Sequence, residues 1–567
     1  MNSVIFKHIS HCWAALTAEE IYRLGCKQVC IAPGSRSTPL VMAFANHSKI
    51  SCHTHFDERS LGFYALGLAK SSESPVVIVT TSGSAVANLL PAVVEAFKSR
   101  IPLLILSSDR PYQQHYHGEN QTITQQQIFG HFVKLFQNIP SPTTSISPSW
   151  ILATIDEAYY KMTTGDSAPV HLNLMFEEPF FNEEKSFKHY LSDISSWINS
   201  SNTLKNIQTS TTTLNHTNKN YSFKNIIAVV GHISNTTDAK SIVSFCKSKH
   251  IPVITECHSK IFGIQNTIHC VDLFIDLFHK NVKSNYTVLF FGDQIISKKC
   301  LNLLKNATHL VHISDIEQSS NPILKSSLTL KSSYSDSISY LNSFISDKNI
   351  TWYNKLSTLY STLLKSHKTN KYDCISEISI LNTLFSNLQK HSLIFVANSL
   401  AIRILNHYIF SPHHHLIYAN RGASGIDGNL STAIGIAKDQ KKELYFVCGD
   451  LSFLYDINAL VLLQQSNVKI KIILLNNNGG KIFTFLPVKK HFNQLNPFFT
   501  TPHNLKMKHI SKQFNLEYDI VEDPKFKNLD RLIKKHINAN KSTLLECFFD
   551  ESNTKRHIDE HTSFFLQ

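Results

Sequence analysis

The sequence lacks any hydrophobic run close to the roughly 18 residues that a membrane span needs, so we expect no transmembrane helix. Its N-terminus, MNSVIFKHISHCWAALTAEE, lacks the basic start, apolar block and small-residue cleavage site of a signal peptide. The 11 cysteines are odd in number and contain no CxxC pair, which argues against a disulfide framework. Together these absences predict a protein of the reducing cytoplasm.

Zinc-finger spacing and dense basic tracts with interleaved aromatics are also absent. The formal charge of +13 and the pI of about 9.0 would suggest nucleic acid as a partner. Because Lys, Asn, Ser and Ile are spread along the whole chain, we interpret the charge as a compositional bias and expect no nucleic-acid partner. A basic pocket for acidic small molecules stays open.

The 567 residues, 42% of them hydrophobic and 17% charged, suffice for about three or four globular domains. Three segments alternate short β-branched runs with helical patterns, which predicts an α/β protein of three doubly wound domains with mainly parallel sheets. The predicted parts are an N-terminal domain over 1–185, a polar linker over 186–221, a central domain over 222–345, a helical connection over 346–385 and a C-terminal domain over 386–567.

A strand in the third segment, KIKIILLNNNGG (469–480), ends in three asparagines and two glycines, which is more than a turn requires. Upstream, ELYFVCGDLSFLYDINAL reads as a strand, Gly449-Asp450 and a helix. A right-handed βαβ crossover would bring Asp450 and Asn477 together at the carboxyl edge of the sheet. Carboxylate and amide oxygens suit Mg²⁺, and Gly479 would let a backbone carbonyl approach closely. The alternative is a turn with an aspartate helix cap.

Two histidine groups could suggest another metal. His53 and His55 form an HxH with Asp57 nearby, as in a metal-dependent hydrolase, but no further ligand cluster supports zinc. The alternative is a partly polar strand. The triple His413-His414-His415 follows Ser-Pro and reads as a loop.

Six motifs in order along the chain carry a resemblance to a known family. They are APGSRSTPL, HFDERSLGFYALGLAK, TSGSAVANL, NRGASGIDG, GDLSFLYDINAL and NNNGGKIFTFLP. The GD–helix–strand–NN unit resembles the thiamine-diphosphate (ThDP) binding motif, although Leu451 replaces its usual second glycine. The set resembles the MenD family, the 2-succinyl-5-enolpyruvyl-6-hydroxy-3-cyclohexene-1-carboxylate synthases, from about residue 10 to 490, with weaker similarity in the middle domain and the C-terminal tail.

The resemblance implies a pyruvate-decarboxylase-like architecture that binds ThDP with Mg²⁺ or Mn²⁺. It implies Asp450, Asn477 and Gly479 as metal ligands and Glu58 as the catalytic acid that hydrogen-bonds the pyrimidine ring. It suggests Ile426 as an apolar prop under the cofactor. Taken alone, Glu58 could be an acid in a first helical turn, and Ile426 could be ordinary core.

The family's two substrates, 2-oxoglutarate and isochorismate, are dicarboxylates, and arginine suits carboxylates. The implied substrate-binding residues are Ser35, Arg36, Arg110, Asn120, Gln121, Lys298, Ser399, Arg403, Arg421, Ile482, Phe483 and Leu486. Lys299 is equally basic, and any lone surface arginine could be a solvated charge. After Gln121 the sequence departs from the family pattern, because Thr and glutamines replace a basic residue and a Pro-Gly; how this loop closes is left open.

The implied activity is that of a transferase in menaquinone biosynthesis. It decarboxylates 2-oxoglutarate and adds the succinyl carbanion equivalent to isochorismate in a 1,4-addition. Similar enzymes are homodimers or dimers of dimers with active sites at the subunit interface. Two alternatives are another ThDP-dependent 2-oxo acid decarboxylase or carboligase, and a non-catalytic ThDP-binding remnant.

Overall fold

The computed structural model of the chain falls into two compact units. The first unit comprises 1–210, 420–441 and 456–468, and the second comprises 211–419, 442–455 and 469–567. The structure describes residues 6, 8–181, 186–207, 214, 223–317, 322–345, 349–369, 372–411, 413–487, 490, 497–522 and 528–566.

The first unit is built on a six-stranded parallel sheet of order β2-β1-β3-β4-β6-β5. Its strands are β1 (Gln28–Ile31), β2 (Ser51–Thr54), β3 (Val76–Thr80), β4 (Leu103–Asp109), β5 (Phe136–Ile139) and β6 (Val170–Met175). The central strands β3, β4 and β6 are buried along their whole length. This explains the continuous apolar runs in β3 and β4, whereas β6 also buries the polar residues His171 and Asn173.

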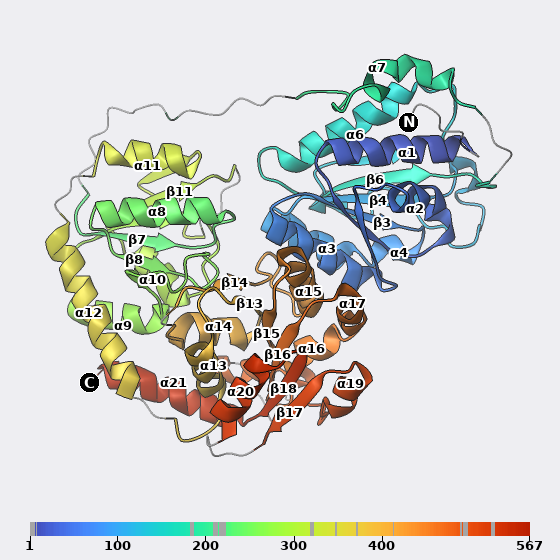
Figure 1. Ribbon diagram of the computed structural model, residues 1–567. Helices are drawn as coiled ribbons and strands as arrows, with labels where there is room; N and C mark the ends of the chain where they lie inside the picture. The colour runs from blue at the N-terminus through green and yellow to red at the C-terminus, as the bar shows by residue number, and fades with distance from the viewer. Residues whose placement is uncertain are drawn as a thin grey trace. The chain divides into compact units, whose positions relative to one another are not determined.

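Helices cover both faces of this sheet (Figure 1). They are α1 (Ile9–Arg23), α2 (Thr38–Ala45), α3 (Glu58–Ser72), α4 (Ser84–Ala87), α5 (Leu90–Ser99) and α6 (Pro148–Thr163). Helices α1 and α6 lie on one face and α3 on the other. This confirms the predicted doubly wound arrangement.

Two helices from the C-terminal third of the chain, α15 (Asn429–Gln440) and α17 (Ala459–Ser466), belong to the first unit. Helix α15 packs on α3 at a glycine contact: a Cβ on Gly67 would lie 2.2 Å from the carbonyl oxygen of Thr432, and one on Gly435 would lie 2.3 Å from that of Tyr64. The two backbones can approach this closely only because neither position carries a side chain.

The polar linker predicted over 186–221 begins later than expected. Residues Tyr190–Ile194 and α7 (Ser195–Ile198) are helical, and Ile194 and Trp197 are buried in the core of the first unit. The indole of Trp197 donates to Oε2 of Glu20 at 2.7 Å, which fixes this segment on α1. The polar composition of this stretch did not reveal that Trp197 is buried and attaches the segment to the first unit. Residues 208–213 and 215–221 of the predicted linker lie outside the described residues.

The second unit holds two further six-stranded parallel sheets, one in each remaining predicted domain. The middle sheet has the order β12-β11-β10-β7-β8-β9, with β7 (Ile226–Val230), β8 (Val253–Thr255), β9 (Thr267–Ile268), β10 (Thr287–Phe291), β11 (His309–Ser314) and β12 (Leu328–Lys331). The last sheet has the order β14-β13-β15-β16-β18-β17, with β13 (Leu393–Val396), β14 (Leu416–Tyr418), β15 (Leu444–Gly449), β16 (Ile470–Asn476), β17 (Glu517–Val521) and β18 (Thr543–Phe548). The first and last sheets therefore share one topology.

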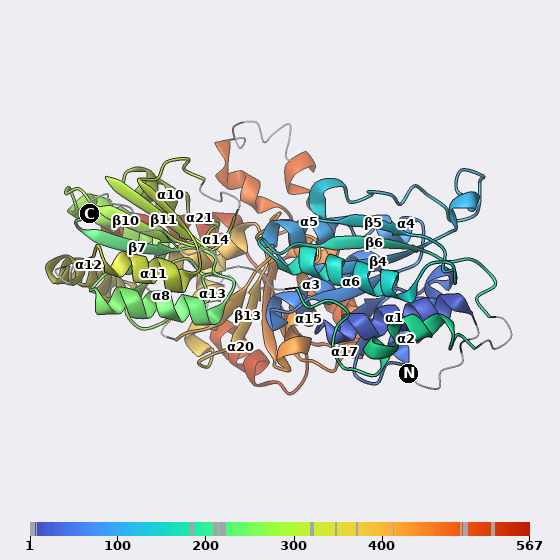
Figure 2. The same ribbon diagram turned by 90° about the horizontal axis from the view of Figure 1, so that it is seen from above.

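Helices pack on both sheets of the second unit. They are α8 (Thr236–Ser248), α9 (Val271–Asn281), α10 (Lys298–Lys305), α11 (Tyr334–Asn342), α12 (Ile350–Thr369), α13 (Glu377–Asn387), α14 (Leu400–Tyr408), α16 (Asp450–Tyr455), α19 (Lys508–Gln513), α20 (Leu529–Asn538) and α21 (Glu551–Leu566). Figures 1 and 2 both show α8 and α11 side by side over the middle sheet. A single buried cluster runs from Phe274 through Leu363 and Phe385 to Val447.

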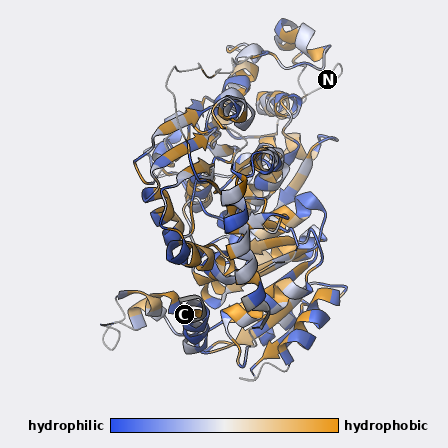
Figure 3. Ribbon diagram, turned by 90° about the vertical axis from the view of Figure 1, so that its left-hand side faces the viewer, coloured by the Kyte–Doolittle hydropathy of each residue, from blue (hydrophilic) through white to orange (hydrophobic). Residues whose placement is uncertain are grey.

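The distribution of hydropathy follows these layers. In Figure 3 the strands are mainly in the hydrophobic colour, whereas the helices mix hydrophobic and hydrophilic residues. Among the described helices, none has both the length and the hydropathy needed to cross a membrane.

Candidate functional site

At the carboxyl edge of the last sheet, Asp450 and the asparagine-rich end of β16 come together. Strands β15 and β16 pair in parallel, with Gly449 opposite Leu475. Asp450 begins α16 and is only 2% exposed. Its Oδ1 accepts from the backbone N–H of Leu451 at 2.7 Å, and its Oδ2 accepts from that of Gly479 at 2.8 Å. The expected juxtaposition of this carboxylate with the NNNGG turn is therefore present.

Electrostatics at Asp450 are set by burial and by one histidine. Burial raises the pKa of the Asp450 carboxyl, and the two backbone N–H groups and His503 oppose this shift. Nε2 of His503 lies 3.2 Å from Oδ2 of Asp450. Because Nδ1 of His503 accepts from the N–H of Leu505 at 2.9 Å, the ring presents its Nε2 to the carboxylate.

The three asparagines that end β16 have three different partners. Asn476 donates to Oε1 of Glu546 at 2.8 Å inside the sheet. The amino group of Asn477 donates to Oε1 of Glu377 at 3.3 Å. Oδ1 of Asn478 accepts from the backbone N–H groups of His503 and Asn504 at 3.0 and 2.8 Å. Asn476 and Asn478 therefore build the turn, whereas the side-chain oxygen of Asn477 accepts no hydrogen bond from the described residues.

Glu377 fixes which end of the Asn477 amide is available. It is 2% exposed, and burial raises the pKa of its carboxyl to about 7. Whether the carboxyl is ionised or not, Oε1 accepts from the amino group of Asn477, so the amide oxygen is the atom left for a cation.

Gly479 occupies a position that no other residue could take without strain. Its φ is +121°, and a Cβ there would lie 2.0 Å from the carbonyl oxygen of Thr500. Gly449, at the end of β15, has nothing within 4 Å of an added Cβ. Of these two glycines, only Gly479 lies where another backbone approaches closely.

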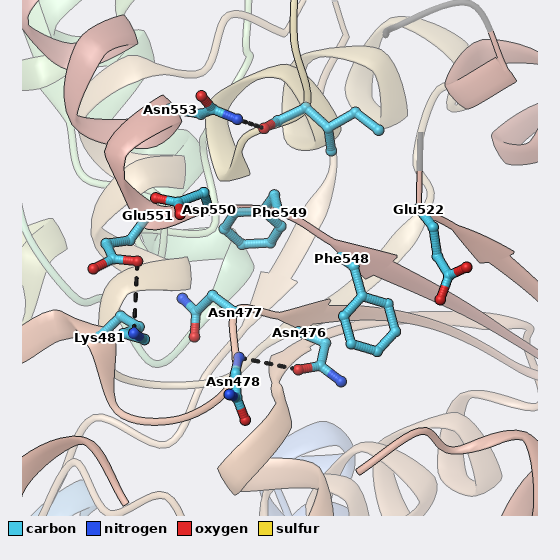
Figure 4. Close-up of a pocket in the computed structure, with 11 residues that line it drawn as sticks. Asn476, Asn477, Asn478, Lys481, Glu522, Phe548, Phe549, Asp550, Glu551 and Asn553 are labelled. Atoms are coloured by element: carbon cyan, nitrogen blue, oxygen red, sulfur yellow. Dashed lines mark hydrogen bonds and ion pairs between the residues drawn. The ribbon is translucent and has the colours of Figure 1, made fainter. Parts of the chain in front are cut away.

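A pocket of about 460 Å³ opens beside these residues (Figure 4). It is lined by Ile375, Asn476, Asn477, Asn478, Lys481, Glu522, Phe548, Phe549, Asp550, Glu551 and Asn553. Lys481 takes part in an ion pair with Glu551, at 3.6 Å between Nζ and Oε2. The lining is mixed in polarity and in charge, and it includes Asn477 of the predicted ligand set.

Three further predicted positions follow in the short helix Lys481–Phe485 and just after it. Ile482 and Phe483 are half-buried, and Leu486 is 41% exposed. Phe483 packs against Phe499 with ring centroids 5.3 Å apart. These apolar side chains are therefore partly accessible in the second unit, next to Gly480.

Ser399 and Arg403 contact each other at the start of α14. Ser399 is the residue before the helix and has φ +71° and ψ −129°, an unusual conformation for a residue with a side chain. The guanidinium of Arg403 donates to the carbonyl oxygen of Ser399 at 2.5 Å. The pair lies at the carboxyl end of β13, the strand next to β15.

The structure distinguishes Lys298 from its equally basic neighbour. Lys299 is bound to Asp276, at 2.5 Å between Nζ and Oδ2. Lys298, the first residue of α10, is exposed and has no acidic partner among the described residues. A lysine at a helix N-terminus adds to the positive end of the helix dipole, which favours an anion there.

In the first unit, Glu58 is the first residue of α3. Asp57 caps this helix and accepts from the N–H groups of Arg59 and Ser60 at 3.0 and 3.2 Å. Glu58 is half-buried, and its Oε2 accepts from Nδ2 of Asn88 at 3.2 Å. The Asp57 cap explains why α3 begins at Glu58, and it places the Glu58 side chain in the first turn of the helix.

Arg36 and Arg110 bring two guanidinium groups to the carboxyl edge of the first sheet. Arg36 donates to the carbonyl oxygen of Phe176 at 2.9 Å and pairs with Glu178 at 3.0 Å. Burial lowers the pKa of Arg36, Glu178 opposes the shift, and the charge of Arg110 adds to it. Arg110 is 8% exposed and donates to Oγ of Ser82 at 2.5 Å. Two like charges within electrostatic reach favour an anionic ligand.

Of the remaining predicted residues of the first unit, Ser35 begins the short 3-10 helix Ser35–Ser37, and the others lie outside helices and strands. Ser35 and Asn120 are exposed, and Gln121 is exposed with its side chain donating to the carbonyl oxygen of Ser82 at 2.9 Å. In the NRGASG loop, Glu95 accepts from the N–H groups of Gly422 and Ala423 at 2.8 and 2.6 Å. This fixes the backbone beside the half-buried Arg421 and the Ile426 side chain, which is 37% exposed.

The first histidine of the HxH motif has hydrogen-bond partners, whereas both ring nitrogens of the buried His55, like those of His415, have none among the described residues. His53 contacts Gln28 at 2.7 Å through Nε2 and Tyr64 at 3.1 Å through Nδ1. In the part of the chain that the structure describes, one group has the spacing of a metal site, namely Asp373, Cys374 and His557. The guanidinium of Arg556 binds both oxygens of Asp373, at 2.9 and 2.6 Å, so a protein cation already neutralises that group.

Several residues that shape the site were not identified from sequence. Asp57, Glu95, Glu377, Asp456 and His503 each hold a site element in place through hydrogen bonds or charge. Asp57 could have been found as a helix cap just before Glu58. The other four depend on contacts distant in sequence, for which the sequence carries no local signal.

Comparison with known proteins covers nearly the whole chain. Residues 13–128 match the N-terminal TPP binding domain of thiamine pyrophosphate enzymes, 188–396 match the middle domain of thiamine pyrophosphate enzymes, and 399–547 match the C-terminal TPP binding domain. The pyruvate-decarboxylase-like order of domains expected from the motifs is therefore confirmed.

Three relatives carry the same name, 2-succinyl-5-enolpyruvyl-6-hydroxy-3-cyclohexene-1-carboxylate synthase. The protein of Psychromonas ingrahamii is 34% identical, covering 98% of this chain and 96% of the relative. That of Shewanella sediminis is 34% identical over 90% of each chain, and that of Vibrio atlanticus is 32% identical over 95% of this chain and 94% of the relative. With this identity along almost its whole length, the chain belongs to the 2-succinyl-5-enolpyruvyl-6-hydroxy-3-cyclohexene-1-carboxylate synthase family of thiamine-diphosphate enzymes.

Proposed function

We propose that this enzyme decarboxylates 2-oxoglutarate and adds the remaining succinyl unit to isochorismate in a 1,4-addition, as a transferase of menaquinone biosynthesis. The observation that carries the proposal is the similarity to named synthases over 98% of the chain. The presence of two guanidinium groups at one sheet edge supports it, because both substrates are dicarboxylates.

The residues around Asp450 fit a divalent cation that holds a diphosphate. A buried carboxylate, an amide oxygen directed by Glu377 and a glycine backbone supply hard oxygen donors, which suit Mg²⁺ or Mn²⁺. We assign Asp450, Asn477 and Gly479 as the ligands. Bound in this way, ThDP would accept the electron pair released when CO₂ leaves 2-oxoglutarate.

We assign the proton chemistry to Glu58. Its carboxyl would exchange a proton with the pyrimidine ring nitrogen of ThDP, while Asn88 holds Oε2 in place. Ile426, an apolar side chain that stays 37% exposed, would support the ring system from below.

The basic residues divide by substrate. Ser399, Arg403 and Arg421 would receive the carboxylate of 2-oxoglutarate that survives decarboxylation. Ser35, Arg36, Arg110, Asn120, Gln121 and Lys298 would bind isochorismate, and Ile482, Phe483 and Leu486 would form the apolar wall. Lys298 is preferred to Lys299, because Asp276 already neutralises Lys299.

The most direct test is product analysis with ThDP, Mg²⁺, 2-oxoglutarate and isochorismate, omitting each in turn. We expect one CO₂ and one adduct of the succinyl unit with isochorismate per turnover, and none without ThDP. Faster turnover of pyruvate than of 2-oxoglutarate would favour another ThDP-dependent decarboxylase. Absence of CO₂ release with any 2-oxo acid would favour a non-catalytic remnant.

The division of the arginines has its own test. Arg403→Ala should impair CO₂ release from 2-oxoglutarate alone, because a carboxylate that loses its buried charged partner loses about 2–5 kcal/mol of binding. Arg36→Ala should leave that step intact and raise the KM for isochorismate. Equal loss of CO₂ release in both variants would contradict the division.

A further inference from the structure

We infer that Gln125 is a positioning residue for the isochorismate site, because its buried amide holds the loop that carries Gln121 against the turn that carries Ser82 and Gly83. This inference rests on the proposed function. It concerns the loop after Gln121 whose sequence departs from the family pattern.

Three consecutive glutamines in this loop differ sharply in environment. Gln125 is 0% exposed, whereas Gln126 is half-buried and Gln127 is exposed with φ +54°. Burial of an uncharged amide is unfavourable unless its donors and acceptor are all used. The sequence QQQ does not distinguish the three positions, so tertiary structure alone selects one of them.

All hydrogen-bonding groups of the Gln125 amide are used. Oε1 accepts from the N–H of Gly83 at 2.8 Å. Nε2 donates to Oδ1 of Asn173 at 2.7 Å and to the carbonyl oxygen of Ser108 at 3.3 Å. Reversing the amide would set donor against donor at Gly83 and acceptor against acceptor at the other two, so a single orientation is stable.

The donors and acceptors of the hydrogen-bond network that continues from Gln125 through Asn173 can be assigned in the same way. Nδ2 of Asn173 donates to Asp109 at 2.8 Å and to Asn138 at 3.0 Å, so Oδ1 is its accepting end. That oxygen also accepts from Oγ of Ser107 at 2.7 Å. Because the one hydroxyl proton of Ser107 is used there, the contact of 2.6 Å with His171 requires Nε2 of the ring to be the donor. Burial lowers the pKa of His171 to about 3, so this ring stays neutral.

On the other side, the network reaches the predicted substrate residues. Arg110 donates to Oγ of Ser82 at 2.5 Å and to the carbonyl oxygen of Gln121 at 3.0 Å. Gln121 donates to the carbonyl oxygen of Ser82 at 2.9 Å. A Cβ on Gly83, whose φ is +85°, would lie 2.9 Å from Cγ of Gln121. Gln125 therefore sets the position of Gly83 and, through Ser82, that of Arg110 and Gln121.

The arrangement also restricts what Gln121 can offer a substrate. One N–H of its amide donates to Ser82, which fixes the orientation of the amide and leaves Oε1 and the second N–H for a ligand. We therefore expect Oε1 of Gln121 to accept a hydrogen bond from the ring hydroxyl of isochorismate, while Arg110 supplies the positive charge for a carboxylate.

The test compares Gln125→Met with the matched controls Gln126→Met and Gln127→Met in the full-length enzyme with ThDP and Mg²⁺. Methionine keeps the approximate shape of glutamine and removes the hydrogen bonds. We expect Gln125→Met to lower kcat/KM for isochorismate on the order of 10²-fold, as for a displacement of about 1 Å. Single-turnover CO₂ release from 2-oxoglutarate should stay in the wild-type range, and both controls should match wild type.

Three outcomes would overturn the inference. The first is a Gln125→Met variant with the same isochorismate kinetics as Gln126→Met. The second is an equal loss of CO₂ release and isochorismate use with a lower Tm, which marks a purely structural role. If Gln125→Met does not fold, Gln125→Glu replaces it in the test, because Glu keeps the acceptor for Gly83 and loses the donor to Asn173. The third outcome that would overturn the inference is unchanged isochorismate kinetics in Gln125→Glu. A wild-type enzyme that releases CO₂ without ever consuming isochorismate would instead overturn the proposed function, and the inference with it.

Discussion

At the scale of single residues, Asp450 carries the metal assignment. It is the one charged group among the three assigned ligands, and it is nearly inaccessible to water. Asp550 lies at the same sheet edge, at the carboxyl end of β18, and accepts from the N–H of Ser552 at 2.8 Å without belonging to the ligand set. Asp550 can therefore serve as the control residue for Asp450 in a mutational test.

Asp450→Ala should abolish Mg²⁺-dependent binding of ThDP, because the remaining donors are neutral oxygens. Asp550→Ala should retain binding and lose at most about 1 kcal/mol of stability as a lost helix cap. Isothermal titration calorimetry of ThDP with and without Mg²⁺ measures both. Unchanged ThDP affinity in Asp450→Ala would contradict the assignment.

Gly479 and Gly449 offer a second comparison of single residues. Gly479→Ala should destabilise the fold by about 1–2 kcal/mol or more, because the left-handed conformation and the contact with Thr500 both oppose a Cβ. Gly449→Ala meets nothing within 4 Å and should be nearly neutral. Thermal unfolding of the two variants gives the difference, and equal Tm values would refute the argument.

At the scale of elements, Asp456 ties two helices of the first unit together. Its Oδ2 accepts from the N–H of Ser431 in α15 at 2.7 Å, and its Oδ1 accepts from Oγ of Ser60 in α3 at 3.2 Å. Burial raises the pKa of the Asp456 carboxyl from 3.8 to about 6. Besides the assigned metal ligand, the motif GDLSFLYD thus contains a second aspartate, Asp456, whose hydrogen bonds connect α3 and α15.

A pH dependence of stability follows from this pKa. Since the folded state binds the proton more tightly than the unfolded state, the contribution to stability is complete below pH 3.8 and is lost as the pH rises through about 6. The Asp456→Asn variant has no carboxyl at this position that could titrate. The Tm of wild type relative to this variant should therefore fall between about pH 4 and pH 6. Calorimetric unfolding across this range tests the sign; a constant difference would show that Asp456 does not titrate there.

At the scale of the whole molecule, the family resemblance predicts active sites shared between the subunits of a homodimer. Glu58 of one subunit would then act with Asp450 of the other. Glu58→Gln alone should lower turnover by about 10²–10⁴-fold while ThDP still binds.

Mixing the two inactive variants tests the shared site. When Glu58→Gln and Asp450→Ala subunits exchange, each mixed dimer regains one site with both residues intact. With random exchange in a twofold dimer, about a quarter of the sites should be active. The readout is CO₂ release before and after subunit exchange, with each variant alone as the control. No recovery despite mixed dimers detected by mass spectrometry would place both residues of a site in one chain.

The sequence by itself determined the fold class and the meeting of Asp450 with the NNNGG turn. Uninterrupted apolar strands such as Ile226–Val230 predict buried parallel sheets, because a strand covered on both faces has no polar side. The crossover rule then predicted Asp450 beside the NNNGG turn, since parallel strands end at one edge. Local chemistry and a fixed handedness suffice for such statements.

Only the tertiary structure decided which polar residues support that site. Nothing in the run Gln125-Gln126-Gln127 reveals that the first is buried, and nothing near Glu377 indicates its hydrogen bond to Asn477. The ion pair that engages Lys299 likewise depends on Asp276, which lies on a different helix. Each of these roles requires partners that are distant in sequence, and a hydrogen bond acts only once folding has brought its two ends to about 3 Å.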